Sequence, residues 1–206
     1  DNIELIEASI KYVIRHVMET CAQDIDFCDT FVHKGLKERL THVLESDFAR
    51  VTYTEAIKIL EANNDPFDFK VSCGSDIQTE HERYLSETHF GRPTFVTDYP
   101  KEIKAFYMRQ NDDGKTVAAV DLLVQDIGEL VGGSQREERL ERLTARMEEL
   151  GLREEDYWWY LDLRKFGGTT HSGYGIGFER LVMFLTGIAN IRDVLPSPRT
   201  TGTAEF

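Results

Sequence analysis

Apolar side chains recur at intervals of three and four residues along the first part of the chain, and this spacing is typical of amphipathic helices. At the start of the chain it predicts a helix over residues 3–20, and further on a second helix over residues 31–46. The hydroxyl side chains of residues 52–54 suit the cap of a third, shorter helix. The sequence Asn-Asn-Asp-Pro at residues 63–66 has the chemistry of a turn and is expected to end that helix.

The pattern changes near residue 92, where short β-branched and aromatic runs alternate with turn residues. These runs predict strands over residues 94–97, 103–109 and 117–124. Residues 111–114, Asn-Asp-Asp-Gly, tolerate positive φ and lie between two of the runs, so we expect a hairpin that joins residues 103–110 to 116–124. The sheet should therefore be at least partly antiparallel.

The last third of the chain contains one more strand pattern, a strongly charged helical pattern and a glycine-rich strand that leads into an apolar helix. Glycines and a serine at residues 132–134 are expected to form the turn between the first two of these elements. The predicted elements are a strand over 127–131, helices over 135–150 and 154–165, a strand over 173–177, and a helix over 178–185 that ends at Gly187.

Helices at the start, an antiparallel sheet next and helices again describe one α+β domain rather than an alternating βαβ protein. No window approaches the roughly 18 to 20 apolar residues of a membrane span, and Asp1-Asn2-Ile3-Glu4 lacks the basic and apolar regions of a signal peptide. We therefore expect a cytoplasmic protein with no membrane partner.

Composition narrows the class of function. The 206 residues include 24 Lys and Arg against 37 Asp and Glu, a net charge of −13. This charge has the wrong sign for a domain that holds nucleic acid mainly by neutralising phosphates. The three cysteines form no Cys-x-x-Cys pair, and the six histidines do not make a metal site by spacing, so zinc chemistry is not expected.

A glycine cluster at residues 173–177 precedes Arg180. The spacing is Gly-x-Gly-x-Gly, not the Gly-x-Gly-x-x-Gly of dinucleotide-binding folds, and no βαβ unit follows, although Asp193 lies twenty residues after Gly173. Glycines let a phosphate or a flat group approach the backbone, and a helix N-terminus with Arg180 favours anions. The pattern indicates a nucleotide site; tight strand packing, with Arg180 paired to a carboxylate, is the alternative.

A second candidate group combines Glu129 with Arg136. Strand alternation predicts that Glu129 and Val131 point to one face, with Arg136 delivered nearby by the following turn. Glu129 could hold Mg²⁺ between phosphates, and the planar fork of Arg136 suits a carboxylate or an amide oxygen. The alternative is a salt bridge at the edge of the sheet.

A third candidate is the segment 99–108, which carries Lys104 and Tyr107 among apolar neighbours. By itself this is an ordinary amphipathic strand.

The three segments together, residues 98–109, 132–137 and 173–180, resemble the asparaginyl-tRNA synthetases, a branch of the class II aminoacyl-tRNA synthetases. The segment 190–200 is similar to the bacterial form, and the resemblance runs over essentially the whole chain. It implies the antiparallel catalytic-domain fold of class II, in which asparagine attacks the α-phosphate of ATP and the asparaginyl group then passes to tRNA. The implied cofactors are ATP and Mg²⁺, and the implied partners are asparagine and tRNA.

The resemblance also implies roles for individual residues. It assigns Arg180 to the adenine and γ-phosphate of ATP, Gly175 and Gly177 to close approach of the nucleotide, Glu129 to Mg²⁺ and Arg136 to the amide oxygen of asparagine. Three further residues are expected in or near the amino-acid pocket, namely Lys104, Tyr107 and His171.

Members of this branch also carry an upstream anticodon-binding domain of OB type, a first motif that builds the homodimer, and a second motif whose arginine binds the α-phosphate. We therefore expect residues 1–206 to be a single C-terminal portion of the catalytic domain, inactive alone and weak in binding tRNA. Two alternatives stay open: a stand-alone paralogue that makes asparagine from aspartate, and a non-catalytic module that binds asparagine or adenylate.

Overall fold

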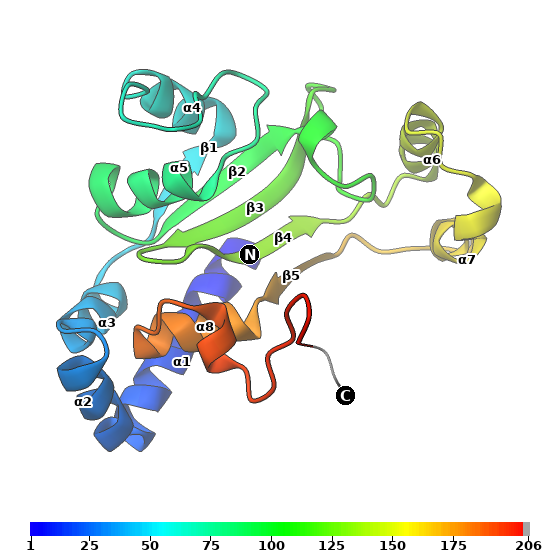
Figure 1. Ribbon diagram of the computed structural model, residues 1–206. Helices are drawn as coiled ribbons and strands as arrows, with labels where there is room; N and C mark the ends of the chain where they lie inside the picture. The colour runs from blue at the N-terminus through cyan, green and yellow to red at the C-terminus, as the bar shows by residue number, and fades with distance from the viewer. Residues whose placement is uncertain (204–206) are drawn as a thin grey trace.

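The computed structural model describes residues 1–203, which form one five-stranded sheet with helices on both faces (Figure 1). The helices are α1 (Asn2–Thr20), α2 (Ala22–Phe31), α3 (Leu36–Glu45), α4 (Tyr53–Glu61), α5 (Thr79–Arg83), α6 (Leu140–Glu149), α7 (Glu154–Lys165) and α8 (Phe178–Thr186). The strands are β1 (Ala49–Thr52), β2 (Thr94–Pro100), β3 (Thr116–Val124), β4 (Gly128–Gln135) and β5 (Ser172–Ile176).

The strands lie side by side in the order in which they occur along the chain. Strand β1 runs parallel to β2, and every other neighbouring pair is antiparallel. The sheet is therefore mixed, and the predicted α+β class with a largely antiparallel sheet is confirmed.

Each face of the sheet has its own apolar core. Helices α1, α3 and α8 cover one face, where Ile10 and Ile14 of α1 pack with Phe95 and Phe184. Helix α4 covers the other face around Tyr53. Helices α6 and α7 form a small separate cluster that projects from the end of the sheet (Figure 1). Among the described residues, no helix is long and apolar enough to cross a membrane.

Several predicted elements are confirmed closely. The first helix, the helix over 154–165 and the final helix occur as α1, α7 and α8, and Gly187 ends α8 with a φ of 75°. Thr52 caps α4 through a capping box with Glu55. These elements could be predicted because capping residues and apolar periodicity are properties of residues that are close together in the sequence.

Other predictions were wrong at their boundaries. The sequence analysis did not anticipate β1 or α2, and the helix expected over 31–46 begins only at Leu36. The interruption follows from Gly35, which adopts the left-handed conformation with a φ of 90° immediately before α3.

The predicted hairpin between residues 103–110 and 116–124 is confirmed only next to its turn, where Gln110 forms an antiparallel bridge with Val117 and the N–H of Ala118 donates to the carbonyl of Arg109 over 2.9 Å. The rest of the prediction was wrong, because residues 101–103 form a short 3₁₀ helix and the remainder of β3 pairs with β2 and β4. The segment that follows bonds to the end of β4, because the N–H of Arg109 donates to the carbonyl of Gln135 over 3.0 Å. The turn itself is real, since the N–H of Gly114 donates to the carbonyl of Asn111.

The turn expected at residues 132–134 is part of strand β4, and helix α6 starts only at Leu140. The glycines serve close packing there. A β-carbon on Gly133 would lie 2.8 Å from both the carbonyl oxygen of Gly173 and the β-carbon of Tyr174. Strands β4 and β5 can therefore pair at this position only because residue 133 has no side chain.

Strand β4 contains one extra residue relative to β3. Leu122 pairs with Val131, but the next residue, Leu123, pairs with Glu129, so that Leu130 is left over as a bulge. The bulge turns Glu129 and Val131 to opposite faces, and the expectation that they share a face was wrong. Gly132, which pairs with Asp121, lies on the same face as Glu129.

A buried arginine on α3 connects the turn between β3 and β4 to helix α8. The guanidinium of Arg39 on α3 donates to the carboxylate of Asp126, in the β3–β4 turn, and to the carbonyl of Phe184 near the end of α8. Its side chain is only 5% exposed, and the ring of Phe184 lies 5.1 Å from the guanidinium carbon. Arg39 thus fixes the turn that leads into β4 relative to the helix that carries Arg180.

We predict that Arg39→Met lowers the free energy of unfolding by about 2–4 kcal/mol, because it leaves the Phe184 carbonyl and a partly buried Asp126 without their partner. Urea denaturation measures this difference. Lys37→Met, on the same helix as Arg39, is the matched control: it removes an exposed ion pair with Asp26 of α2 and should change stability far less than Arg39→Met. Equal effects of the two substitutions would contradict the role of Arg39.

Candidate functional site

Two carboxylates converge above Gly132 on the face of the sheet opposite α1. A β-carbon on Gly132 would lie 2.6 Å from Oε1 of Glu129 and 3.4 Å from Oδ1 of Asp121. Asp121 is buried in strand β3, and Glu129 is half-buried at the start of β4. The glycine therefore leaves open the space into which both carboxylates point.

This pair of carboxylates suits Mg²⁺. Hard oxygen ligands are what Mg²⁺ prefers, and it is usually held by one or two carboxylates, with water and phosphate oxygens completing its shell. The described part of the chain contains no group of three or more His, Cys, Asp or Glu side chains arranged for a metal ion. A cation here would consequently need oxygens from a substrate or from water.

The electrostatics of the pair match that interpretation. Burial raises the pKa of Glu129, and the neighbouring charge of Asp121 raises it further, whereas Lys104 and Arg180 lower it. Two like charges at close range are unfavourable unless a cation lies near them. The pair thus provides a site at which positive charge is stabilised.

Lys104 is the cation nearest to this pair. Its Nζ lies 2.6 Å from Oδ2 of Asp121 and 3.9 Å from the centre of the Tyr99 ring. Burial, together with the charge of Asp121 and a hydrogen bond to it, keeps the pKa of Tyr99 well above its usual value. Lys104 is therefore paired with Asp121 beside the two carboxylates, and its expected role in the amino-acid pocket stays a prediction.

A third carboxyl group lies beneath the pair. Glu82, on α5, accepts a hydrogen bond of 3.0 Å from the backbone N–H of Glu129. Burial raises its pKa to about 7, and the charges of Glu129 and Asp121 act in the same direction. Near neutral pH, Glu82 is thus divided between its protonated and ionised forms.

Arg136, at the end of β4, is held in place without a carboxylate partner. Its guanidinium donates to Oγ of Ser134 over 2.8 Å and lies 4.9 Å from the centre of the Tyr107 ring. Within residues 1–203 it makes no ion pair, so the alternative of a salt bridge with Glu129 at the sheet edge was wrong. Most of its five N–H donors remain available to a ligand.

The glycines of β5 give this face a flat floor. Gly173 pairs with Ser134 and Gly175 pairs with Gly132, so both glycines lie on the face that carries the carboxylates. A β-carbon on Gly175 would meet no atom within 4 Å. The space above Gly175 is therefore open to a ligand, whereas Gly177 lies next to the Arg180 side chain at the start of α8.

Arg180 extends from the first turn of α8 toward β4. Its guanidinium donates to the backbone carbonyl of Glu129, and it forms no ion pair in the described part of the chain. The alternative in which Arg180 pairs with a carboxylate was therefore wrong. The side chain is exposed, so its other donors remain accessible to an anion.

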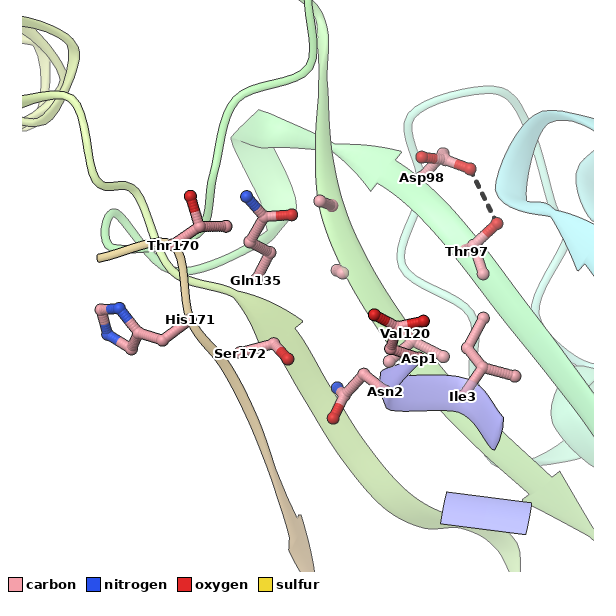
Figure 2. Close-up of a pocket in the computed structure, with 12 residues that line it drawn as sticks. Asp1, Asn2, Ile3, Thr97, Asp98, Val120, Gln135, Thr170, His171 and Ser172 are labelled. Carbon is pink, nitrogen blue, oxygen red and sulfur yellow. Dashed lines mark hydrogen bonds between the residues drawn. The ribbon is translucent and has the colours of Figure 1, made fainter. Parts of the chain in front are cut away.

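His171 lies apart from the other expected pocket residues. Its backbone carbonyl accepts a bond of 2.9 Å from Arg136 N–H, but its ring lies 2.9 Å, at Nδ1, from the carbonyl oxygen of Thr169. Together with Gln135 and Val120 it lines a cavity of about 640 Å³ on the α1 face, and Figure 2 shows its ring turned away from Val120. A role for His171 in binding stays a prediction.

Three residues of this site were not predicted from the sequence: Asp121, Glu82 and Ser134. Asp121 could have been predicted from the sequence, because it is the only acidic residue in the apolar run Val-Ala-Ala-Val-Asp-Leu-Leu-Val. A buried carboxylate needs a partner, so its position indicates a polar contact. Glu82 reaches the site only through the packing of α5 on β4, which no local pattern reveals.

Three comparisons relate the chain to known proteins. Residues 1–201 match the family model described as tRNA synthetases class II (D, K and N). The chain is 66% identical, over all 206 residues, to an asparagine–tRNA ligase of Clostridium botulinum (strain Eklund 17B / Type B), and it spans 44% of that relative's length.

Solved structures of asparaginyl-tRNA synthetases are also similar to this chain. The asparaginyl-tRNA synthetase of Pyrococcus horikoshii, complexed with asparaginyl-adenylate, matches with a TM-score of 0.87 and 37% identity, over 98% of this chain and 45% of that one. The Entamoeba histolytica asparaginyl-tRNA synthetase, also with asparaginyl-adenylate, matches with a TM-score of 0.85 and 33% identity over the same shares. These similarities identify the catalytic-domain fold that the sequence predicted.

The raised pKa of Glu82 predicts a pH dependence of stability. The folded protein binds this proton with a pKa of about 7, against an ordinary value of 4.5, so folding takes up a proton between these values. The free energy of unfolding therefore falls as the pH rises from 4.5 to 7 and then levels off. Glu82→Gln, which keeps an oxygen to accept the Glu129 N–H, should stabilise the protein by about 1–3 kcal/mol at pH 8 and by much less at pH 4.5.

Urea denaturation at the two pH values measures this effect. Glu80→Gln on the same helix is the control, because hydrogen bonds from the N–H groups of Phe69 and Asp68 lower the pKa of Glu80. Its substitution should destabilise at pH 8, the opposite sign. A Glu82→Gln protein no more stable than the original at pH 8 would contradict the assignment.

Proposed function

The chain belongs to the class II tRNA synthetases of the D, K and N group, and from this membership we propose that the protein activates asparagine with ATP and transfers the asparaginyl group to tRNA. The chain spans 44% of the length of the asparagine–tRNA ligase it matches, so this activity is proposed for the full-length protein. Residues 1–206 would supply one portion of its catalytic domain, with the tRNA-binding domain and the first two class II motifs elsewhere.

The observation that carries this proposal is the arginine without a carboxylate partner. The half-buried guanidinium of Arg136 is fixed by Ser134 and Tyr107 and has free N–H donors on the face that holds the two carboxylates. A fixed fork of donors recognises a planar oxygen acceptor, such as the side-chain oxygen of asparagine. We assign Arg136 to the amino-acid side chain, with Lys104 and Tyr107 beside it.

The same face suits a nucleotide and its metal ion. The open space above Gly175 would allow close approach of ATP, and we assign Arg180, whose remaining donors are exposed, to the base and the phosphates. Asp121 and Glu129 would hold Mg²⁺. When bound, Mg²⁺ would neutralise charge on the phosphate oxygens.

Adenylate formation needs little covalent chemistry from the protein. The carboxylate of asparagine attacks the α-phosphate, the bond to pyrophosphate breaks, and negative charge builds up at the phosphorus centre. Arg180 would stabilise that charge, while Arg136 keeps the amino acid in line. No nucleophilic side chain is required, which agrees with the absence of a Ser–His–Asp or Cys–His arrangement in the sequence.

We predict that Arg136→Met in the full-length protein reduces kcat/KM for asparagine by roughly 100-fold or more, because a charge-assisted hydrogen bond of about 3 kcal/mol is lost. Asparagine-dependent ATP–pyrophosphate exchange measures this loss. Arg142→Met, on the exposed face of α6, is the matched control and should leave exchange unchanged.

The same assay separates the alternatives. Exchange with asparagine but not aspartate supports the synthetase. Ammonia-dependent formation of asparagine from aspartate without tRNA would instead identify the paralogue, and binding of asparagine without any exchange would identify the binding module. Homodimerisation, which the resemblance implies, is tested separately by sedimentation velocity of the full-length protein.

A further inference from the structure

Lys104 is expected to contact substrate, but its ammonium already forms an ion pair within the protein. Its ammonium contacts Oδ2 of Asp121 at 2.6 Å, and the two side chains are only 20% and 11% exposed. The Tyr99 ring lies 3.9 Å from the same ammonium, so two independent contacts hold it against the acidic pair. In this arrangement Lys104 is not free to bind a substrate anion.

The second carboxylate oxygen of Asp121, Oδ1, does not contact Lys104. Oδ1 points into the space above Gly132 that it shares with Oε1 of Glu129. One carboxylate therefore serves two cations at once: Lys104 at Oδ2, and whatever positive charge enters between Oδ1 and Glu129. Since both cations lie beside a single carboxylate, each must weaken the binding of the other.

We propose that Lys104 is a resident counter-cation, which neutralises the Asp121–Glu129 pair until a divalent cation binds and then releases its ammonium to the carboxylate of the incoming amino acid. The flexible four-carbon stem of lysine allows this movement, and the partial exposure of Lys104 gives it a path. Metal binding and amino-acid binding then support each other, because the metal frees the group that the carboxylate needs. The second half of this proposal rests on the proposed function; the first half does not.

Titration of the full-length protein with Mn²⁺, followed by electron paramagnetic resonance, tests the first half without any substrate. Lys104→Met should bind Mn²⁺ about threefold to tenfold more tightly than the original protein, because a competing positive charge is gone. Lys104→Arg keeps the charge and should bind Mn²⁺ within about twofold of the original. Lys101→Met is the matched control, since Lys101 lies three residues away and pairs with Glu149 on α6.

Calorimetric titration with asparagine, with and without Mg²⁺, tests the release. The original protein should bind asparagine at least threefold more tightly when Mg²⁺ is present, and Lys104→Met should lose this dependence. A Lys104→Met protein that binds Mn²⁺ as weakly as the original, or more weakly, would overturn the counter-cation role. If asparagine bound to neither protein, the release and the proposed function would fail together, while the Mn²⁺ comparison would still decide the first half.

Discussion

The extra residue in strand β4 is the constraint on which the site depends. With regular alternation, Glu129 would share a face with Val131 and point into the core beneath α1, away from Asp121. The bulge at Leu130 turns Glu129 over, so that it lies with Asp121 above Gly132. A bulge beside a functional site is a common way to re-aim one side chain without changing the sheet. The N–H of Glu129 donates to Glu82, and Lys104, which is paired with Asp121, lies close enough to lower the pKa of Glu129.

The site also has to compensate for several carboxyl groups that lie close together. A chain with a net charge of −13 brings three carboxyl groups together on a partly buried surface, which is unfavourable without compensation. Compensation comes from Lys104 and Arg180, and from partial protonation of Glu82 near neutral pH. Such a site favours entry of a divalent cation. Arg136, in contrast, is kept free of carboxylates, which leaves its donors for a neutral amide or an anionic ligand.

Local patterns predicted the outer helices, the capped start of α4 and the glycine strand that leads into α8, because periodicity and capping are properties of neighbouring residues. The turn expected at residues 132–134 was wrong, because the sequence could not reveal that Gly133 packs against β5 and Gly132 faces two carboxylates. Glu129, Arg136 and Gly175 were named on residue type and resemblance and lie on one face of the sheet, and Arg180, named in the same way, bonds to the backbone carbonyl of Glu129. Asp121 and Glu82 were missed because their role arises from long-range pairing of strands and packing of α5.

Double substitution shows whether Asp121 and Glu129 hold one cation between them. Mn²⁺ binding to the full-length protein would be measured for Asp121→Asn, Glu129→Gln and the two combined. We expect each single change to weaken binding about tenfold or more and the double change to weaken it by less than the two effects added, because both residues act on one shared ion. Binding that is unaffected by Asp121→Asn, or effects that add fully, would contradict a shared site.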